Sequence, residues 1–195
     1  MSELSAIGAP TRALWEWLVA PYTLLVIAFG IGVRISADAN RALRITGTLI
    51  TVHGALGLAW PFAPMHQRET LAAGGSTVSD TLHLVLGAVT VLLMLMAITF
   101  AAAAFGKWFR VYSFATLAIL FVFGALTFLD APNIGTNLPT PWVGLWERIN
   151  IGAFLLWIAV LAVRMLSPAA AARCAASSRA RVALVRSPSC QIACA

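Results

Sequence analysis

Long apolar stretches alternate with short polar connections along the chain. Five apolar stretches of about 20 residues occur, at residues 17–33, 45–62, 81–105, 111–129 and 142–166. A helix of about 20 residues crosses a hydrocarbon core roughly 30 Å thick, and in lipid a helix satisfies its own backbone polar groups. The pattern therefore predicts an all-α fold, a polytopic transmembrane bundle of about five spans.

The composition supports a membrane protein over a soluble one. Hydrophobic residues make up 61% of the 195 residues and charged residues only 10%, whereas soluble domains carry about 25% charged residues. We therefore expect a multi-pass membrane protein, with membrane lipid as its immediate partner.

The basic residues predict the orientation, because Lys and Arg in short loops stay on the cytoplasmic side. Ten of the 13 basic residues fall on one side of the predicted bundle, and six of the seven acids fall on the other. The basic side carries Arg34, Arg41, Arg44, Lys107, Arg110, Arg164, Arg173, Arg179, Arg181 and Arg186. The amino terminus is thus predicted outside and the carboxyl terminus inside, and the net charge of +6 reflects topology and predicts no nucleic-acid partner.

A change of composition near Ser167 marks the only predicted domain boundary. Residues 1–166 are predicted to form the helical bundle, and residues 167–195, rich in Ala, Ser and Arg, a disordered basic cytoplasmic tail. The three cysteines, Cys174, Cys190 and Cys194, lie in this tail. Thiols stay reduced on the cytoplasmic side, so no disulfide is expected.

Asp80 and His83 are the first candidates for chemistry. They are three residues apart at the start of the third span, so they share one helix face, and Ser79 is placed to cap that helix. A carboxylate beside an imidazole can orient the ring and raise its basicity. The alternative is a helix start at which Asp80 stabilises the helix dipole and His83 lies at the interface.

The outer loop before this helix, residues 63–81, adds His66, Arg68 and Glu69. These residues offer an imidazole, a fixed cation and a carboxylate, although a solvated turn would look the same. A second outer loop, residues 130–141, is rich in Pro, Gly and Asn, which favour irregular backbone.

Glu147 and Arg148 follow Pro141, a favoured first residue of a helix, so they are predicted roughly 8 to 11 Å along the fifth span. Charges at that depth usually face a polar cavity or a partner. We expect them to join Asp80 and His83 in a polar cluster, with Arg148 paired to Asp80 or Glu147. The alternative is a pair that extends to the membrane surface.

His53 is the only ionisable residue predicted in the middle of a span, within the segment Thr-Val-His-Gly-Ala-Leu-Gly. Small residues let neighbouring helices approach closely, so hydrogen-bonded packing is expected. Haem would need a second histidine deep in a span, and the sequence has none. Apart from Arg164 near the end of the fifth span, the cytoplasmic halves of the third, fourth and fifth spans lack charged residues and histidines. This disfavours a transporter, because an ion path needs polar groups across the midplane.

Four groups of short motifs fall on the predicted outer side. In chain order they are Ser2-Glu3-Leu4 with Gly8-Ala9-Pro10, Trp60-Pro61-Phe62 with Pro64-Met65-His66, Ser79-Asp80-Thr81-Leu82-His83, and Gly144-Leu145-Trp146-Glu147-Arg148-Ile149. Over residues 2 to about 166, their order and spacing resemble the bacterial domain-of-unknown-function 998 family. The resemblance implies a multi-spanning fold in the bacterial plasma (inner) membrane, with no established activity. It also implies six spans in family members, so the chain is expected to lack the first of them.

Three classes of function stay open. The favoured one is a membrane protein that binds a lipid, a small amphiphilic ligand, a peptide or a membrane partner at the outer leaflet, with Arg68, Arg148, Glu147 and Glu69 as ligand-binding residues. The alternative is a membrane-embedded enzyme acting on a lipid-like or anionic substrate, with His83, Asp80, His66 and Glu147 as catalytic candidates; a transporter comes third. No cofactor or metal is predicted, although His66, His83, Asp80 and Glu147 could supply ligands to a divalent cation.

Overall fold

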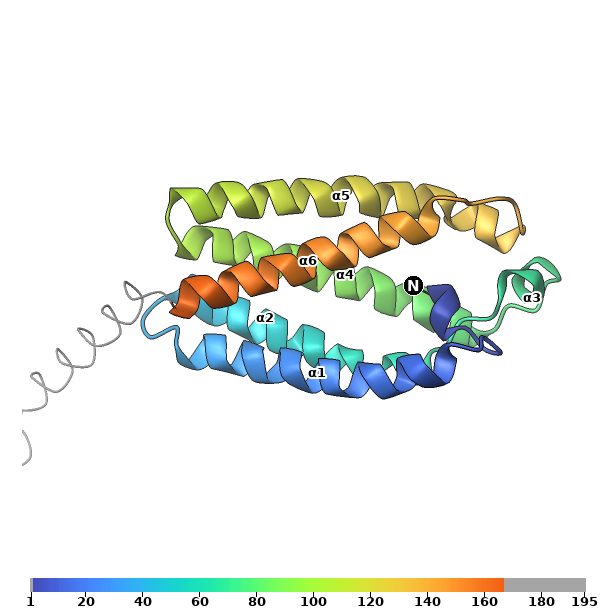
Figure 1. Ribbon diagram of the computed structural model, residues 1–195, viewed down its shortest axis with the longest axis horizontal. Helices are drawn as coiled ribbons and strands as arrows, with labels where there is room; N and C mark the ends of the chain where they lie inside the picture. Colours follow the sequence, from blue (N-terminus) through green and yellow to red (C-terminus); the bar gives the residue numbers. More distant parts are fainter. Residues whose placement is uncertain (1, 167–195) are drawn as a thin grey trace, which may run out of the picture. The chain divides into compact units, whose positions relative to one another are not determined.

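The computed structural model describes residues 2–166, and every regular element within them is helical (Figure 1). The elements are η1 (Ser2–Ser5), α1 (Arg12–Ile35), α2 (Arg41–Gly57), η2 (Trp60–Phe62), α3 (Arg68–Ala72), α4 (Val78–Ala104), α5 (Lys107–Gly135) and α6 (Val143–Leu166). The predicted all-α class is therefore confirmed. The predicted tail, residues 167–195, lies outside the described residues.

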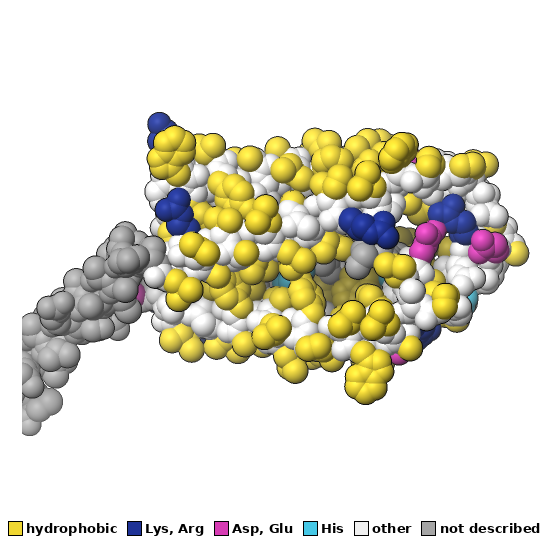
Figure 2. Space-filling model, in the orientation of Figure 1, with side chains coloured by type: hydrophobic (Ala, Val, Ile, Leu, Met, Phe, Trp, Pro, Cys, Tyr) yellow, Lys and Arg dark blue, Asp and Glu magenta, His cyan; other side chains and the backbone are white. Residues whose placement is uncertain are grey.

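Five of the described helices are long and apolar enough to cross a membrane: α1, α2 with η2, α4, α5 and α6. Many of their large apolar side chains point away from the protein; Trp17 is 81% exposed and Phe121 is 72% exposed. Figure 2 shows hydrophobic side chains over most of the visible helical surface. A soluble monomer rarely exposes so much apolar area, so these surfaces fit a lipid environment and a multi-pass membrane protein.

The chain divides into two compact units, residues 1–157 and residues 158–195, with the boundary inside α6. The described part of the second unit is the helical segment 158–166. Within the first unit, α1 packs on α2, α2 on α4, and α4 on α5, and consecutive helices run in opposite directions (Figure 1). The first part of α6 joins them through Trp157, whose Nε1 donates to Ser113 Oγ at 3.1 Å.

The alternating directions give the first unit two ends of different character. One end holds η1, η2, α3, the starts of α1, α4 and α6, and the connection from α5 to α6; we call it the polar end. The other holds the α1–α2 and α4–α5 connections, with Arg34, Arg41, Arg44, Lys107 and Arg110 in or beside them. We call it the basic end.

Glycines bring α1 and α2 into backbone contact. A Cβ atom on Gly30 would lie 2.5 Å from the Thr51 nitrogen, and one on Gly54 would lie 2.9 Å from the Ile27 nitrogen. This confirms the prediction that small residues around His53 permit close approach. His53 is buried and its ring meets Phe154 edge-on, with centroids 5.0 Å apart. The expected hydrogen bond is missing at Nδ1, which has no partner among the described residues.

Two predicted boundaries near the polar end were wrong. Helix α5 continues to Gly135, through Pro132, instead of ending near Leu129. The proline removes one backbone donor without ending the helix, and the chain turns only at Asn137, where φ is 56°, a conformation that asparagine tolerates better than most residues. Helix α6 begins at Val143, two residues after Pro141. Glu147 and Arg148 are therefore only about 6 to 8 Å along the helix.

Candidate functional site at the polar end

Asp80 organises the start of α4. The helix begins at Val78 with Thr77 as its N-cap residue, and Asp80 Oδ2 accepts from the Thr77 backbone N–H at 2.8 Å and from Thr77 Oγ1 at 3.0 Å. The prediction that Ser79 caps this helix was wrong, because its hydroxyl donates to the Pro64 carbonyl at 2.7 Å. An acidic residue in the first turn also complements the positive end of the helix dipole.

The same carboxylate holds His66. The His66 backbone N–H donates to Asp80 Oδ1 at 2.7 Å, and His66 Nδ1 lies 2.9 Å from Asp80 Oδ2. Asp80 is buried, and the His66 side chain is 22% exposed. One carboxylate therefore fixes both the start of α4 and the loop that precedes it.

His83 lies apart from this contact, contrary to the predicted Asp80–His83 pairing. Its Nδ1 is 2.9 Å from the Ala63 carbonyl oxygen, and its ring meets Trp60 edge-on with centroids 4.8 Å apart. Residues three apart share a helix face, but here both Asp80 oxygens are already bonded to His66 and Thr77. Through this contact with Ala63, His83 connects the segment after η2 to α4.

Arg68 connects three segments of the polar end. Its Nη2 donates to Glu3 Oε1 at 2.6 Å and to Thr140 Oγ1 at 3.0 Å, and Nη1 donates to the Leu138 carbonyl at 3.4 Å. The segment around η1 is held further by the Ile7 backbone N–H, which donates to the Met65 carbonyl at 2.9 Å. Arg68 thus joins η1, α3 and the connection from α5 to α6.

Arg148 stays outside this network. It is exposed, and its Nη1 donates to the Gly144 carbonyl of its own helix at 2.8 Å. The predicted pair of Arg148 with Asp80 does not occur, since Asp80 is bonded to His66 and Thr77. The shallower start of α6 explains the difference, because an arginine near the end of a span reaches the surface with its long side chain. Glu147, the residue before Arg148, is half-buried, and Glu69 on α3 is exposed.

Of the predicted residues, the structure pairs His66 with Asp80 and places Arg68 in a separate set of bonds. Arg148 and Glu69 lie at the surface. Sequence reasoning did not single out Thr77 or Thr140. The signal for Thr77 was present, because a threonine three residues before an acidic residue is the pattern of a capping box. Thr140 carried no comparable signal. Figure 2 shows Lys or Arg and Asp or Glu side chains close together at this end.

The His66–Asp80 contact offers one chemical possibility. A carboxylate that accepts from Nδ1–H leaves Nε2 as the proton acceptor of the neutral ring. No group of three His, Cys, Asp or Glu side chains suited to a metal ion occurs among residues 2–166. The four ligands considered for a divalent cation are therefore not gathered in the described part of the chain.

Comparison with known proteins settles the family. The family described as Protein of unknown function (DUF998) matches residues 1–164. The chain belongs to the DUF998 family. No curated protein and no solved structure matches it. Membership in the DUF998 family confirms the resemblance seen in the motifs, and the family description names no reaction.

Proposed function

We propose that this protein is a multi-pass protein of the bacterial plasma membrane that binds an anionic amphiphile, a membrane lipid above all, at the outer leaflet. Arg148 is the proposed binding residue. The observation that supports this is its position: it is exposed and, among the described residues, bonded only to a carbonyl of its own helix. The proposal places the polar end outside, as the distribution of basic residues predicts.

Asp80 and Arg68 already use most of their hydrogen-bonding capacity within the polar end. Asp80 accepts from His66 and Thr77, and Arg68 donates to Glu3, Thr140 and the Leu138 carbonyl. A guanidinium has five N–H donors, and Arg148 uses one of them in the bond that we describe. Arg148 can therefore donate to a phosphate or carboxylate without breaking the network.

The surroundings of Arg148 suit an amphiphile. Leu145, one turn earlier on the same side of α6, is 46% exposed, and Trp142 before the helix is 60% exposed. Tryptophan favours the interface between lipid and water. A ligand with an anionic head at Arg148 and an apolar part against Leu145 would meet matching groups at both ends.

A membrane-embedded enzyme is the second candidate, because His66 and Asp80 lie 2.9 Å apart in the geometry of a general base and its orienting carboxylate. Turnover of a lipid-like or anionic substrate that disappears in His66→Gln, with lipid binding intact, would support it. Under the binding function alone, the wild type turns over no such substrate, and His66→Gln changes stability while Arg148-dependent binding stays in place.

We expect Arg148→Gln to weaken retention of an anionic phospholipid about tenfold, because it removes a charge-assisted hydrogen bond. Native mass spectrometry of the protein released from nanodiscs containing phosphatidylglycerol measures the retained lipid. Arg12→Gln is the matched control, since it makes the same charge change at the same end in a residue already paired with Glu16 at 2.8 Å. Equal retention by the wild type and both variants would exclude Arg148 as the binding residue.

A further inference from the structure

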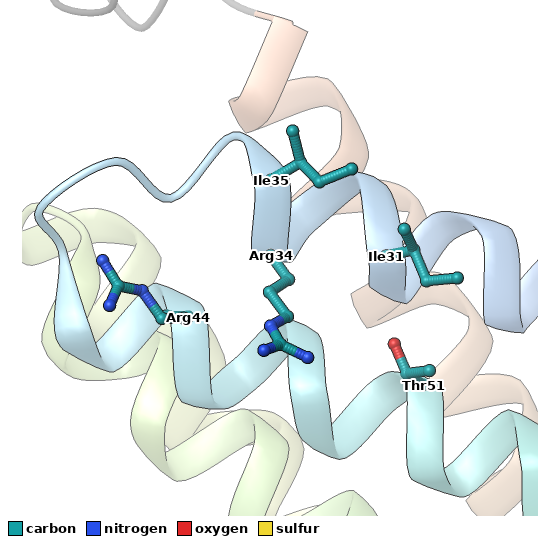
Figure 3. A pocket seen from close by; sticks show the side chains of 5 residues that line it. All are labelled: Ile31, Arg34, Ile35, Arg44 and Thr51. Carbon is teal, nitrogen blue, oxygen red and sulfur yellow. The ribbon is translucent and has the colours of Figure 1, made fainter.

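A hollow of about 430 Å³ opens at the basic end, where α1 ends and α2 begins. Its lining consists of Ile31, Arg34 and Ile35 from α1 and Arg44 and Thr51 from α2 (Figure 3). Pockets for small ligands typically have roughly 300 to 1,000 Å³. The hollow lies at the end of the unit opposite the polar end, so it is separate from the site around Arg148.

Backbone packing fixes the position of Arg34. A Cβ atom on Gly47 would lie 2.5 Å from the Arg34 nitrogen and 2.8 Å from its Cα, so the last turn of α1 lies directly on α2. Figure 3 shows the Arg34 side chain crossing α2, with Arg44 on one side and Thr51 on the other. Arg44 donates to the Asp38 carbonyl in the turn between the helices, where Asp38 has a φ of 49°.

The two arginines are not neutralised within the lining. Among the described residues the Arg34 side chain has no hydrogen bond or ion pair, and the Arg44 guanidinium donates to a neutral backbone carbonyl. None of the five lining residues is acidic. Arg34 and Arg44 both line the hollow, with the Arg44 guanidinium directed toward the turn between α1 and α2 (Figure 3). Two like charges in one lining repel each other, and an anion with several acceptor oxygens relieves that repulsion through charge-assisted hydrogen bonds. Phosphate is one of the two anions, with carboxylate, whose geometry matches the paired donors of arginine.

The rest of the lining is apolar or already bonded. Ile31 is 44% exposed and Ile35 is 76% exposed, although both belong to a membrane-spanning helix. The Thr51 hydroxyl donates to the Gly47 carbonyl at 2.8 Å, so it is not available as a donor. Thr51 follows Arg44 by seven residues, about 10 Å along the helix. The hollow therefore extends from the charged groups at the basic end toward the middle of the span.

We propose that this hollow binds the phosphate group of an anionic phospholipid, with Arg34 and Arg44 as donors and the acyl chain against Ile31 and Ile35. Basic pockets between helices on the cytoplasmic side are suited to such head groups, and the basic residues predict that this end is cytoplasmic. The site lies in the leaflet opposite the function proposed above and does not depend on it.

The test uses the full chain in nanodiscs of phosphatidylcholine, into which phosphatidylglycerol is titrated while retained lipid is counted by native mass spectrometry. Arg34→Gln combined with Arg44→Gln should weaken retention of phosphatidylglycerol at least tenfold. Arg41→Gln, the same charge change at an exposed position outside the lining, should leave it unchanged. Arg34→Lys should recover part of the retention, since lysine keeps the charge and loses the paired donors.

A second arm separates lipid from free phosphate by measuring thermal unfolding in detergent with inorganic phosphate alone. Stabilisation by phosphatidylglycerol and none by phosphate supports the lipid site. Equal stabilisation by inorganic phosphate, lost in the double variant, would overturn the assignment to lipid. Retention that falls equally in Arg41→Gln and the double variant, both with native helix content by circular dichroism, would reduce the effect to net charge and remove the site.

Discussion

Replacement of Asp80 by asparagine should destabilise the polar end by about 3 kcal/mol, because a buried carboxylate with several charge-assisted hydrogen bonds is lost. Asp80 accepts from the backbone N–H groups of His66 and Thr77, and its Oδ2 also meets the Thr77 hydroxyl and His66 Nδ1. Asparagine keeps one acceptor oxygen and turns an amide toward groups that are themselves donors. The start of α4 and the loop before it should then loosen together.

Thermal unfolding in detergent and amide hydrogen exchange measure this loss. The midpoint should fall, and exchange should accelerate at the His66 and Thr77 amides. Glu69→Gln is the matched control: it removes one negative charge from the same loop, but the Glu69 side chain is exposed on α3. If Asp80→Asn unfolds at the same temperature as Glu69→Gln, with unchanged exchange at both amides, Asp80 does not hold this end together.

Substitution of alanine for Gly30 should cost about 1 to 3 kcal/mol, the usual penalty for forcing extra volume into a packed site. The new Cβ would lie 2.5 Å from the Thr51 nitrogen and 3.0 Å from the Gly47 carbonyl oxygen. Both are backbone atoms, so the clash is relieved only if α1 and α2 move apart. The contacts at Gly54 and Gly57 on the same pair of helices would then weaken as well.

Gly32→Ala is the control for this substitution, because it lies two residues away on α1 and a Cβ there meets nothing within 4 Å. Alanine has the better helix propensity by up to about 1 kcal/mol, so Gly32→Ala should unfold at the wild-type temperature or slightly higher. A Gly30→Ala variant as stable as Gly32→Ala would mean that α1 and α2 are not in backbone contact in the folded protein.

The helices could be predicted from the sequence because each needs only a local apolar stretch of sufficient length. All five predicted spans fall on α1, α2 with η2, α4, α5 and α6. Their ends were harder to place. The second outer loop was predicted to begin at Asp130, whereas α5 continues through Pro132 to Gly135, because a proline removes a single donor and neighbouring backbone bonds can hold the helix.

The candidate site shows the same division between local and distant information. Capping of α4 by Asp80 was readable, because it involves residues three apart. The partner of Asp80 was not: His66 is 14 residues away and reaches it only through the path of the loop. Helix spacing favoured His83 as the partner. Spacing does not reveal that a residue of the preceding loop, His66, already bonds both oxygen atoms of Asp80. Arg68 bonds Thr140 over a separation of 72 residues, beyond any local pattern.

The placement of Arg148 depended on the first residue of α6. A start at Pro141 would have put the guanidinium deep enough to require a buried partner, whereas the start at Val143 leaves it exposed. Two residues of helix amount to about 3 Å. The predicted buried ion pair therefore depended on a helix start that lies two residues later in the structure.

Both binding proposals rest on orientation, with the polar end outside and the basic end inside. Fusion of alkaline phosphatase, which is active only after export, to the loop at Gly74 and separately to Lys107 tests this directly. Gly74 lies between α3 and α4 at the polar end, and Lys107 begins α5 at the basic end. We predict high phosphatase activity for the Gly74 fusion and none for the Lys107 fusion. Activity at Lys107 with none at Gly74 would contradict the orientation and both sites assigned from it.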